Sequence, residues 1–178
     1  VNGAIRCKKG HGGVLQTADT YENFAVQLEF KLPPAGNNGL GIRTPDDVKD
    51  GAYDGMELQV LDDTAPVYTD LHDYQFCGSL YGLAPARPGF LRAVCEWKFE
   101  QVNGNGNNIV VELNGYEIVN VDVSKVRERP IDGNKHPGAF RTSGHFGFAG
   151  HRDPVMFRNI AIKRLTPAGA ETPASPAP

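Results

Sequence analysis

Arg43, Glu57 and Gln59 are the residues whose types and spacing suggest chemistry. Glu57 and Gln59 are two positions apart in a segment of alternating apolar and polar residues, so their side chains share one face of a predicted strand. Arg43 ends the preceding strand and projects from the same face if the two strands pair. On a concave sheet this trio can bind sugar hydroxyls, with Glu57 as acid or base and Arg43 polarising a carbonyl or orienting Glu57. The alternative is a structural ion pair between the strands.

Asp62 does not complete a pair of glycosidase carboxylates with Glu57. Five positions along a regular strand span about 16 Å and place the two side chains on opposite faces, whereas such pairs lie about 5 to 9.5 Å apart. Asp62 and Asp63 are instead expected to fix the loop at the end of the strand or to reach over its rim.

Aromatic and histidine side chains add further candidates. Tyr53, Tyr81 and Trp97 can stack on a sugar ring, or pack in the core or at an edge. His145 and His151 flank a glycine-rich strand end, where each can contact a sugar, transfer a proton or hold the rim.

Asp70, His72 and Asp73 place three donor side chains within four residues. These side chains can hold a divalent metal, although their spacing matches no standard metal-binding motif. The alternative is an ordinary polar loop. No cofactor is expected.

The three cysteines, Cys7, Cys77 and Cys95, form no CxxC pair. They are either small buried hydrophobic residues or, for Cys77 and Cys95, a disulfide suited to an oxidising compartment.

The elements that must position these residues are strands. Apolar and polar residues alternate with a period of two, and no window of a dozen residues shows a helical period. We predict strands at residues 21–32, 40–43, 55–63, 96–102, 109–113, 116–123, 145–149 and 155–165. This pattern predicts an all-β fold of two stacked antiparallel sheets, a sandwich or jelly roll.

The connections between the predicted strands show clear turn signals. Residues 37–39 predict a turn, Asn114-Gly115 predicts a two-residue hairpin, and residues 103–108 read as a hairpin turn rather than a phosphate loop. A shift of the apolar phase predicts a bulge near Arg158 and Asn159. Residues 64–89 are expected to form a long irregular excursion, and loops of that length are often functional.

Composition limits the organisation of the chain and its partners. The 178 residues suit one domain, predicted at 1–165, followed by a Pro/Ala-rich tail or linker at 166–178 that can lead to another domain. A net charge of −3 argues against nucleic-acid binding, and no apolar run is long enough to span a membrane. The chain begins with Val1 rather than Met, which predicts a processed or trimmed N-terminus.

Taken together, the segments resemble the 3-keto-disaccharide hydrolase family. The matching pieces occur in the family's order and cover roughly residues 3 to 165: 21–30, 37–43, 55–63, 78–82, Asn114-Gly115 and 157–160. The resemblance implies a concanavalin A-like (laminin-G-like) jelly-roll sandwich in an exported bacterial protein, whether periplasmic, cell-surface or secreted, that binds carbohydrate.

The resemblance also implies a reaction. In a 3-keto-glycoside the proton on C2 is acidified by the carbonyl, so a base can remove it while the substituent on C1 leaves, and water then adds. One base and one electrophile suffice. Our candidate catalytic residues for this reaction are Glu57, Arg43 and Gln59, and our candidate substrate contacts are Tyr53, Asp62, Tyr81, Trp97 and His151. The main alternative is a non-catalytic glycan-binding module, since one fold carries many functions, and a third possibility is a structural or adhesion domain.

Overall fold

The computed structural model describes residues 3–166, which form two antiparallel sheets packed face to face. The six-stranded sheet has the order β1 (Ile5–Arg6), β10 (Met156–Arg164), β3 (Phe24–Lys31), β6 (Lys98–Asn105), β7 (Asn108–Leu113) and β8 (Tyr116–Asp122). The four-stranded sheet has the order β2 (Gly12–Tyr21), β9 (Gly144–His151), β4 (Asn37–Thr44) and β5 (Met56–Leu61). This arrangement confirms the predicted all-β sandwich.

The core lies between the sheets and follows from the period of two. Leu40 and Ile42 of β4, like Leu58 and Val60 of β5, are almost completely buried. Their partners on the six-stranded sheet are the alternating residues of β3, including Phe30. Because alternate side chains point to opposite faces, the residues between them lie on the outer face of each sheet.

Three predicted features of the connections are confirmed and one is wrong. Residues 103–108 contain the hairpin turn that joins β6 to β7. Asn114 and Gly115 both have positive φ, as a two-residue hairpin requires, and the register of β10 shifts between Arg158 and Ala161. Residues 37–39, in contrast, form the start of β4 and pair with β5. Strand β2 was not predicted, because most of its residues are exposed and leave no alternating pattern.

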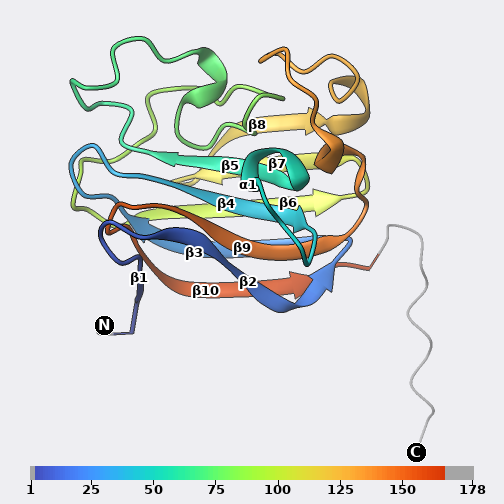
Figure 1. Cartoon of the computed structure of the whole chain (residues 1–178), viewed down its shortest axis with the longest axis horizontal. Coiled ribbons are helices and arrows are strands. Elements are labelled where there is room, and N and C mark those ends of the chain that lie inside the picture. Colours follow the sequence, from blue (N-terminus) through green and yellow to red (C-terminus); the bar gives the residue numbers. More distant parts are fainter. Residues whose placement is uncertain (1–2, 167–178) are drawn as a thin grey trace, which may run out of the picture.

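Long irregular segments cover one end of the sandwich. In Figure 1 the two sheets lie one over the other, and residues 64–97 and 123–143 form its upper rim. A short helix, α1 (Gly51–Asp54), follows β4 and begins at Asp50, whose side chain accepts a hydrogen bond from the backbone N–H of Ala52. The predicted tail lies outside the described residues from Pro167 onward.

The three cysteines, all within the described part of the chain, are unpaired. Cys77 is buried, whereas Cys95 is exposed, so the alternative of a disulfide between them is wrong. Burial raises the pKa of the Cys77 thiol well above its ordinary value, so this residue stays protonated. Among residues 3–166 no helix is long and apolar enough to cross a membrane.

Candidate functional site

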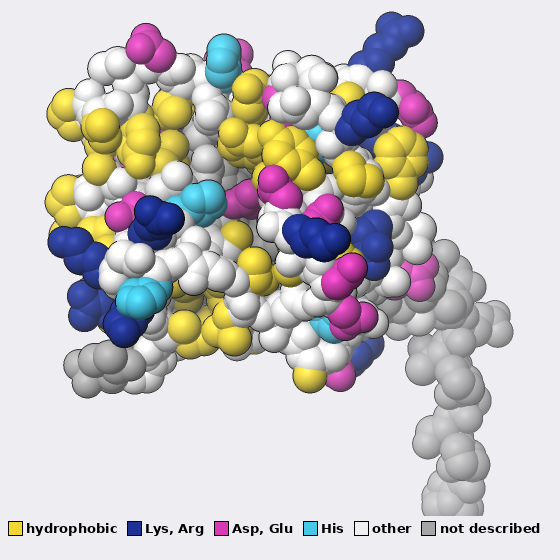
Figure 2. Space-filling view, viewed as in Figure 1, with side chains coloured by type: hydrophobic (Ala, Val, Ile, Leu, Met, Phe, Trp, Pro, Cys, Tyr) yellow, Lys and Arg dark blue, Asp and Glu magenta, His cyan; other side chains and the backbone are white. Residues whose placement is uncertain are grey.

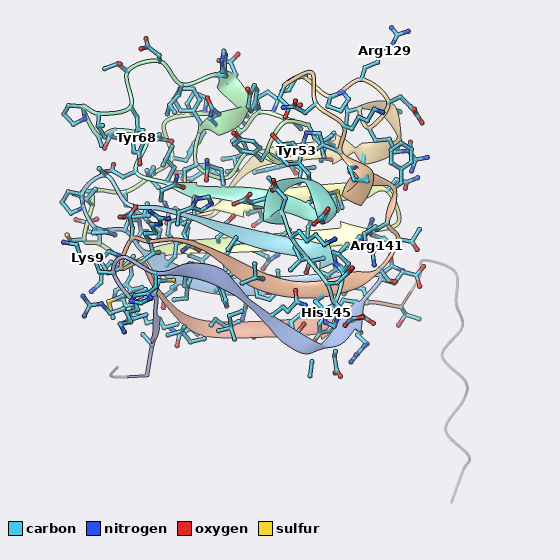
Figure 3. The ribbon with its side chains drawn as sticks, viewed as in Figure 1. Lys9, Tyr53, Tyr68, Arg129, Arg141 and His145 are labelled. Atoms are coloured by element: carbon cyan, nitrogen blue, oxygen red, sulfur yellow. The ribbon has the colours of Figure 1, made fainter. Side chains whose placement is uncertain are left out.

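A polar cavity of about 360 Å³ opens on the outer face of the four-stranded sheet. Its floor is formed by Glu57, Gln59 and Leu61, the outward-facing residues of β5. The surrounding walls come from the start of β4, α1 and the residue before it, the irregular segment after β5, and the end of β9. They are formed by Asn37, Asp50, Gly51, Ala52, Tyr53, Tyr68, Leu71, Gln75, Tyr81 and His151. Its volume is at the lower end of the range typical of small-ligand sites. Figure 3 shows Tyr53 and Tyr68 on the segments above β5.

Glu57 fits at the floor because two glycines of the neighbouring strand β4 leave room for its side chain. It pairs with Gly41, while Gln59 pairs with Gly39. A Cβ atom added to Gly39 would overlap the carboxylate of Glu57. The glutamate therefore lies along β4 and keeps only 7% of its side chain exposed. As predicted, Glu57 and Gln59 share one face and lie in one cavity.

His151 supplies a titratable partner for Glu57. Its Nε2 lies 3.6 Å from Oε1 of Glu57, and 48% of its side chain is exposed. The interaction with Glu57 raises the pKa of His151, an effect that partial burial opposes. A buried carboxyl group and a partly exposed imidazole, two side chains that can act as acid or base, therefore lie in the same cavity.

Two phenols line the cavity on either side of this pair. The hydroxyl of Tyr53 lies 3.3 Å from Oδ2 of Asp132, and its ring packs at 4.7 Å from that of His136. Burial, and then the charge of Asp132, raise the pKa of Tyr53, so its phenol remains a hydrogen-bond donor. Tyr81 lies beside Glu57 because its backbone N–H donates to the carbonyl of Glu57 at 2.8 Å.

Arg43 does not join Glu57, so both predicted interpretations of this pair are wrong. Its backbone has φ of 53°, and the pairing of β4 with β9 shifts register between Gly41 and Thr44. This irregularity redirects the side chain, which is buried and donates to the carbonyls of Glu22, Gly106 and Arg141. Arg43 thus connects β4 to three loops at one end of the sandwich.

Asp62 and Trp97 also lie away from the cavity. Asp62 is buried and accepts hydrogen bonds from the backbone N–H of Ala35 and the hydroxyl of Thr64, which agrees with the loop-fixing alternative and not with a substrate contact. Trp97 packs against the side chains of Lys31 and Arg158, which belong to the other sheet. The expectation that Trp97 faces the same sugar as Glu57 is wrong.

The histidines of the loops have structural partners. Among the described residues no group of three or more side chains is placed to hold a metal ion. His72 stacks on Tyr74 at 5.3 Å, so Asp70, His72 and Asp73 do not form the metal site that was one interpretation of the sequence. His145 bonds to the carbonyl of Thr17 and to Asp46 at the edge of the sheet.

Several cavity residues had no signal of their own in the sequence. Tyr68 and Gln75 belong to the irregular excursion, which sequence analysis marked as a functional loop without selecting residues from it. Asp50 is a helix-capping residue that also brings a second carboxylate to the cavity wall. These residues line one cavity only because α1 and the irregular excursion both fold over β5.

The two stacked antiparallel sheets define a jelly-roll domain. A carbohydrate-binding module from Bacillus subtilis has the same fold, with 13% sequence identity and a TM-score of 0.57 over 90% of this chain and 85% of that chain.

Comparison with a family model places the chain more closely. The model of the 3-keto-alpha-glucoside-1,2-lyase-like domain matches residues 1–163, so the chain belongs to this family. A Bacteroides thetaiotaomicron protein named 3-keto-disaccharide hydrolase is 28% identical over 199 aligned positions, which cover 92% of this chain and 66% of that protein. A Parabacteroides distasonis protein provisionally named a glycosyl hydrolase has a crystal structure with a TM-score of 0.81 and 28% identity, over 93% of this chain and 88% of that chain.

Proposed function

We propose that this protein cleaves 3-keto-glycosides by elimination and hydration at the anomeric centre, with Glu57 as the base. The observation that carries the proposal is the pair formed by Glu57 and His151 at the floor of a polar cavity of sugar size. The family match and the name of the Bacteroides relative support the same class of substrate.

Elimination begins at C2 of the oxidised sugar. Glu57 takes the proton from C2, the electrons of the C–H bond form a double bond between C1 and C2, and the bond from C1 to the leaving oxygen breaks. His151, beside Glu57, protonates that oxygen as a general acid. Water then adds across the double bond, with its hydroxyl on C1 and a proton on C2, to give the free 3-keto sugar.

The carbonyl at C3 needs hydrogen-bond donors as negative charge develops on its oxygen. Because Arg43 is bound to backbone carbonyls elsewhere, this role falls to neutral donors in the cavity. The amide of Gln59 and the phenol of Tyr81 are present there, whereas the hydroxyl of Tyr53 already donates to Asp132. Neutral donors fixed in a partly buried site can stabilise such charge because they need no reorganisation during the reaction.

The test is aglycone release from 3-keto-glucosides and from their unoxidised parents. Wild-type protein should cleave only the oxidised glycosides. Glu57→Gln, which keeps the shape of the side chain, should lower the rate by about 10²-fold to 10⁴-fold. Glu117→Gln, an exposed carboxylate on β8, is the matched control and should retain the rate.

Two outcomes would overturn the proposal. Binding of the sugars without turnover by wild-type protein would identify a glycan-binding module instead. Turnover that Glu57→Gln leaves unchanged would remove Glu57 from the reaction.

A further inference from the structure

A second and larger cavity, of about 760 Å³, lies in the loop between β8 and β9. Its charged lining residues are Arg127, Arg129, Lys135 and Glu128, so positive side chains outnumber negative ones. Figure 2 shows basic and hydrophobic side chains next to each other over this loop, at the upper right of the molecule. Arg129 extends furthest from the body of the protein (Figure 3).

The cavity also contains an exposed aromatic ring, Phe140, with the guanidinium of Arg127 stacked over it. Phe140 is 48% exposed, and the guanidinium of Arg127 lies over its ring at 4.7 Å. Nε of Arg127 is buried and has no hydrogen-bond partner among residues 3–166. A ligand in the cavity cannot reach this buried atom, so it would contact the terminal nitrogens of the guanidinium.

These features together select a class of ligand. An exposed ring favours contact with a flat apolar group, and a guanidinium favours a carboxylate, which it can bind in a planar geometry. Lys135 adds a second positive charge at the same cavity. The matching ligand is an aromatic carboxylate.

The two cavities meet at Tyr53. This residue lines the cavity of Glu57, whereas Asn134 and His136 line the loop cavity. The side-chain amide of Asn134 donates to the hydroxyl of Tyr53 at 3.3 Å, and the rings of Tyr53 and His136 lie 4.7 Å apart. No residue in the described part of the chain lines both cavities, so a leaving group that reaches from a sugar over Glu57 toward Arg127 would have to pass over these contacts of Tyr53 with Asn134 and His136.

We infer that the loop cavity is a subsite for the leaving group and takes an aromatic aglycone that carries a carboxylate. The inference rests on the proposed function, because a leaving-group subsite needs a sugar that is cleaved beside Glu57. It adds the chemical class of the aglycone and the residues that recognise it, Arg127, Lys135 and Phe140.

The first experiment compares 3-keto-glucosides with 4-carboxyphenyl and 4-carbamoylphenyl aglycones, which differ in charge at the same position. Wild-type protein should prefer the carboxylate in kcat/KM, and Arg127→Gln should reduce that preference by about tenfold or more, the loss expected for a charge-assisted hydrogen bond. Lys135→Gln, at an exposed residue, should reduce it less. Comparing each variant with wild type cancels the intrinsic difference between the leaving groups.

Arg92→Gln is the matched control, because Arg92 is exposed in a loop and does not line the cavity. It should keep the preference of the wild type. Arg127→Lys, which keeps the charge but not the planar donor set, should give an intermediate value and guards against a variant that fails to fold.

The second experiment measures binding of free 4-hydroxybenzoate by NMR titration of the same proteins, which does not depend on turnover. Binding that weakens in Arg127→Gln and not in Arg92→Gln supports the cavity assignment. Turnover without any preference for the carboxylate overturns the inference and leaves the proposed function intact. Binding without turnover of any 3-keto-glycoside overturns the proposed function and with it the leaving-group role.

Discussion

Glu57 depends on a glycine of the neighbouring strand as much as on its own position. Gly39 lies where a Cβ atom would meet the carboxylate, Cδ and Cγ of Glu57. A strand interior usually disfavours glycine, so its presence at this position is explained by the close approach of the glutamate. The geometry of the proposed base is thus built from two strands.

We predict that Gly39→Ala destabilises the fold by about 1 to 3 kcal/mol and displaces Glu57, because an added methyl group overpacks the site. Thermal or urea unfolding and the rate of aglycone release measure the two effects. A double-mutant cycle provides the control: in a Glu57→Ala background the three clashing atoms are absent, so Gly39→Ala should cost much less. An equal cost in both backgrounds would show that Gly39 matters for another reason.

Part of the site was predictable at this scale and part was not. The spacing of Glu57 and Gln59 alone places both side chains on one face. Tyr53, Tyr81 and His151, which sequence analysis selected by residue type, line the same cavity. The predicted direction of the Arg43 side chain was wrong because the left-handed backbone of Arg43 breaks the alternation at the end of the strand. No local sequence pattern predicts a left-handed arginine.

At the scale of elements, Asn114 in the turn between β7 and β8 connects this hairpin to two other segments. Asn114 has φ of 53°, and its side-chain oxygen accepts from the backbone N–H of Phe99 while its amide donates to the carbonyl of Phe90. The turn is therefore tied to β6 and to the irregular segment before it.

We predict that Asn114→Gly costs about 1 to 2 kcal/mol, since it keeps the left-handed backbone but loses both side-chain hydrogen bonds. Asn114→Ala should cost roughly 1 kcal/mol more, because alanine is also strained at positive φ. Urea denaturation of the two variants measures the difference. An alanine variant as stable as the glycine variant would contradict the assignment of strain to this position.

Elements with one buried face were the ones that sequence analysis could locate. β3 alternates between buried and less buried residues, and β5 alternates between apolar and polar residues although all six are buried. β2 is exposed along most of its length and has no hydrophobic face to detect. Residues 37–39 looked like a turn because asparagine and glycine favour turns. In the structure Asn38 is fully buried and Gly39 makes room for Glu57, so tertiary contacts override the local preference.

At the scale of the whole molecule, the sheets were predictable but the assembly of the cavity was not. Period-two segments imply two packed sheets wherever they pair. The cavity walls come instead from α1, the excursion after β5 and the end of β9, and their meeting depends on long-range contacts such as that between Tyr53 and Asp132. The local sequence of these segments does not predict that they come together around one cavity.

The packed sheets also enclose a carboxyl group that affects the stability of the whole sandwich. Glu100 of β6 is fully buried, and neither of its oxygens has a hydrogen-bond partner among residues 3–166. Burial raises its pKa to about 8, so the folded protein keeps this residue protonated at neutral pH. In the unfolded chain the same group ionises above its ordinary pKa of about 4.3.

The sign of the pH dependence follows from these two values. Below pH 4 Glu100 is protonated in both states and has no effect; as the pH rises, the unfolded chain releases the proton while the folded protein retains it. Folding stability therefore falls by about 1.4 kcal/mol per pH unit from this group, until the folded pKa is reached near pH 8. Over two pH units this loss of folding stability is a substantial part of the free energy of unfolding of a typical domain, which is roughly 5 to 15 kcal/mol.

We predict that Glu100→Gln, which cannot ionise, removes this slope and stabilises the protein increasingly between pH 5 and pH 8. Urea denaturation at pH 5, 6, 7 and 8 measures the free energy of unfolding of both proteins, with Glu117→Gln at an exposed site as the control for a change in net charge. The difference between Glu100→Gln and wild type should grow with pH, whereas the control should show no such trend. A constant difference would mean that Glu100 is ionised in the folded sandwich, and that a partner for its charge exists between the sheets.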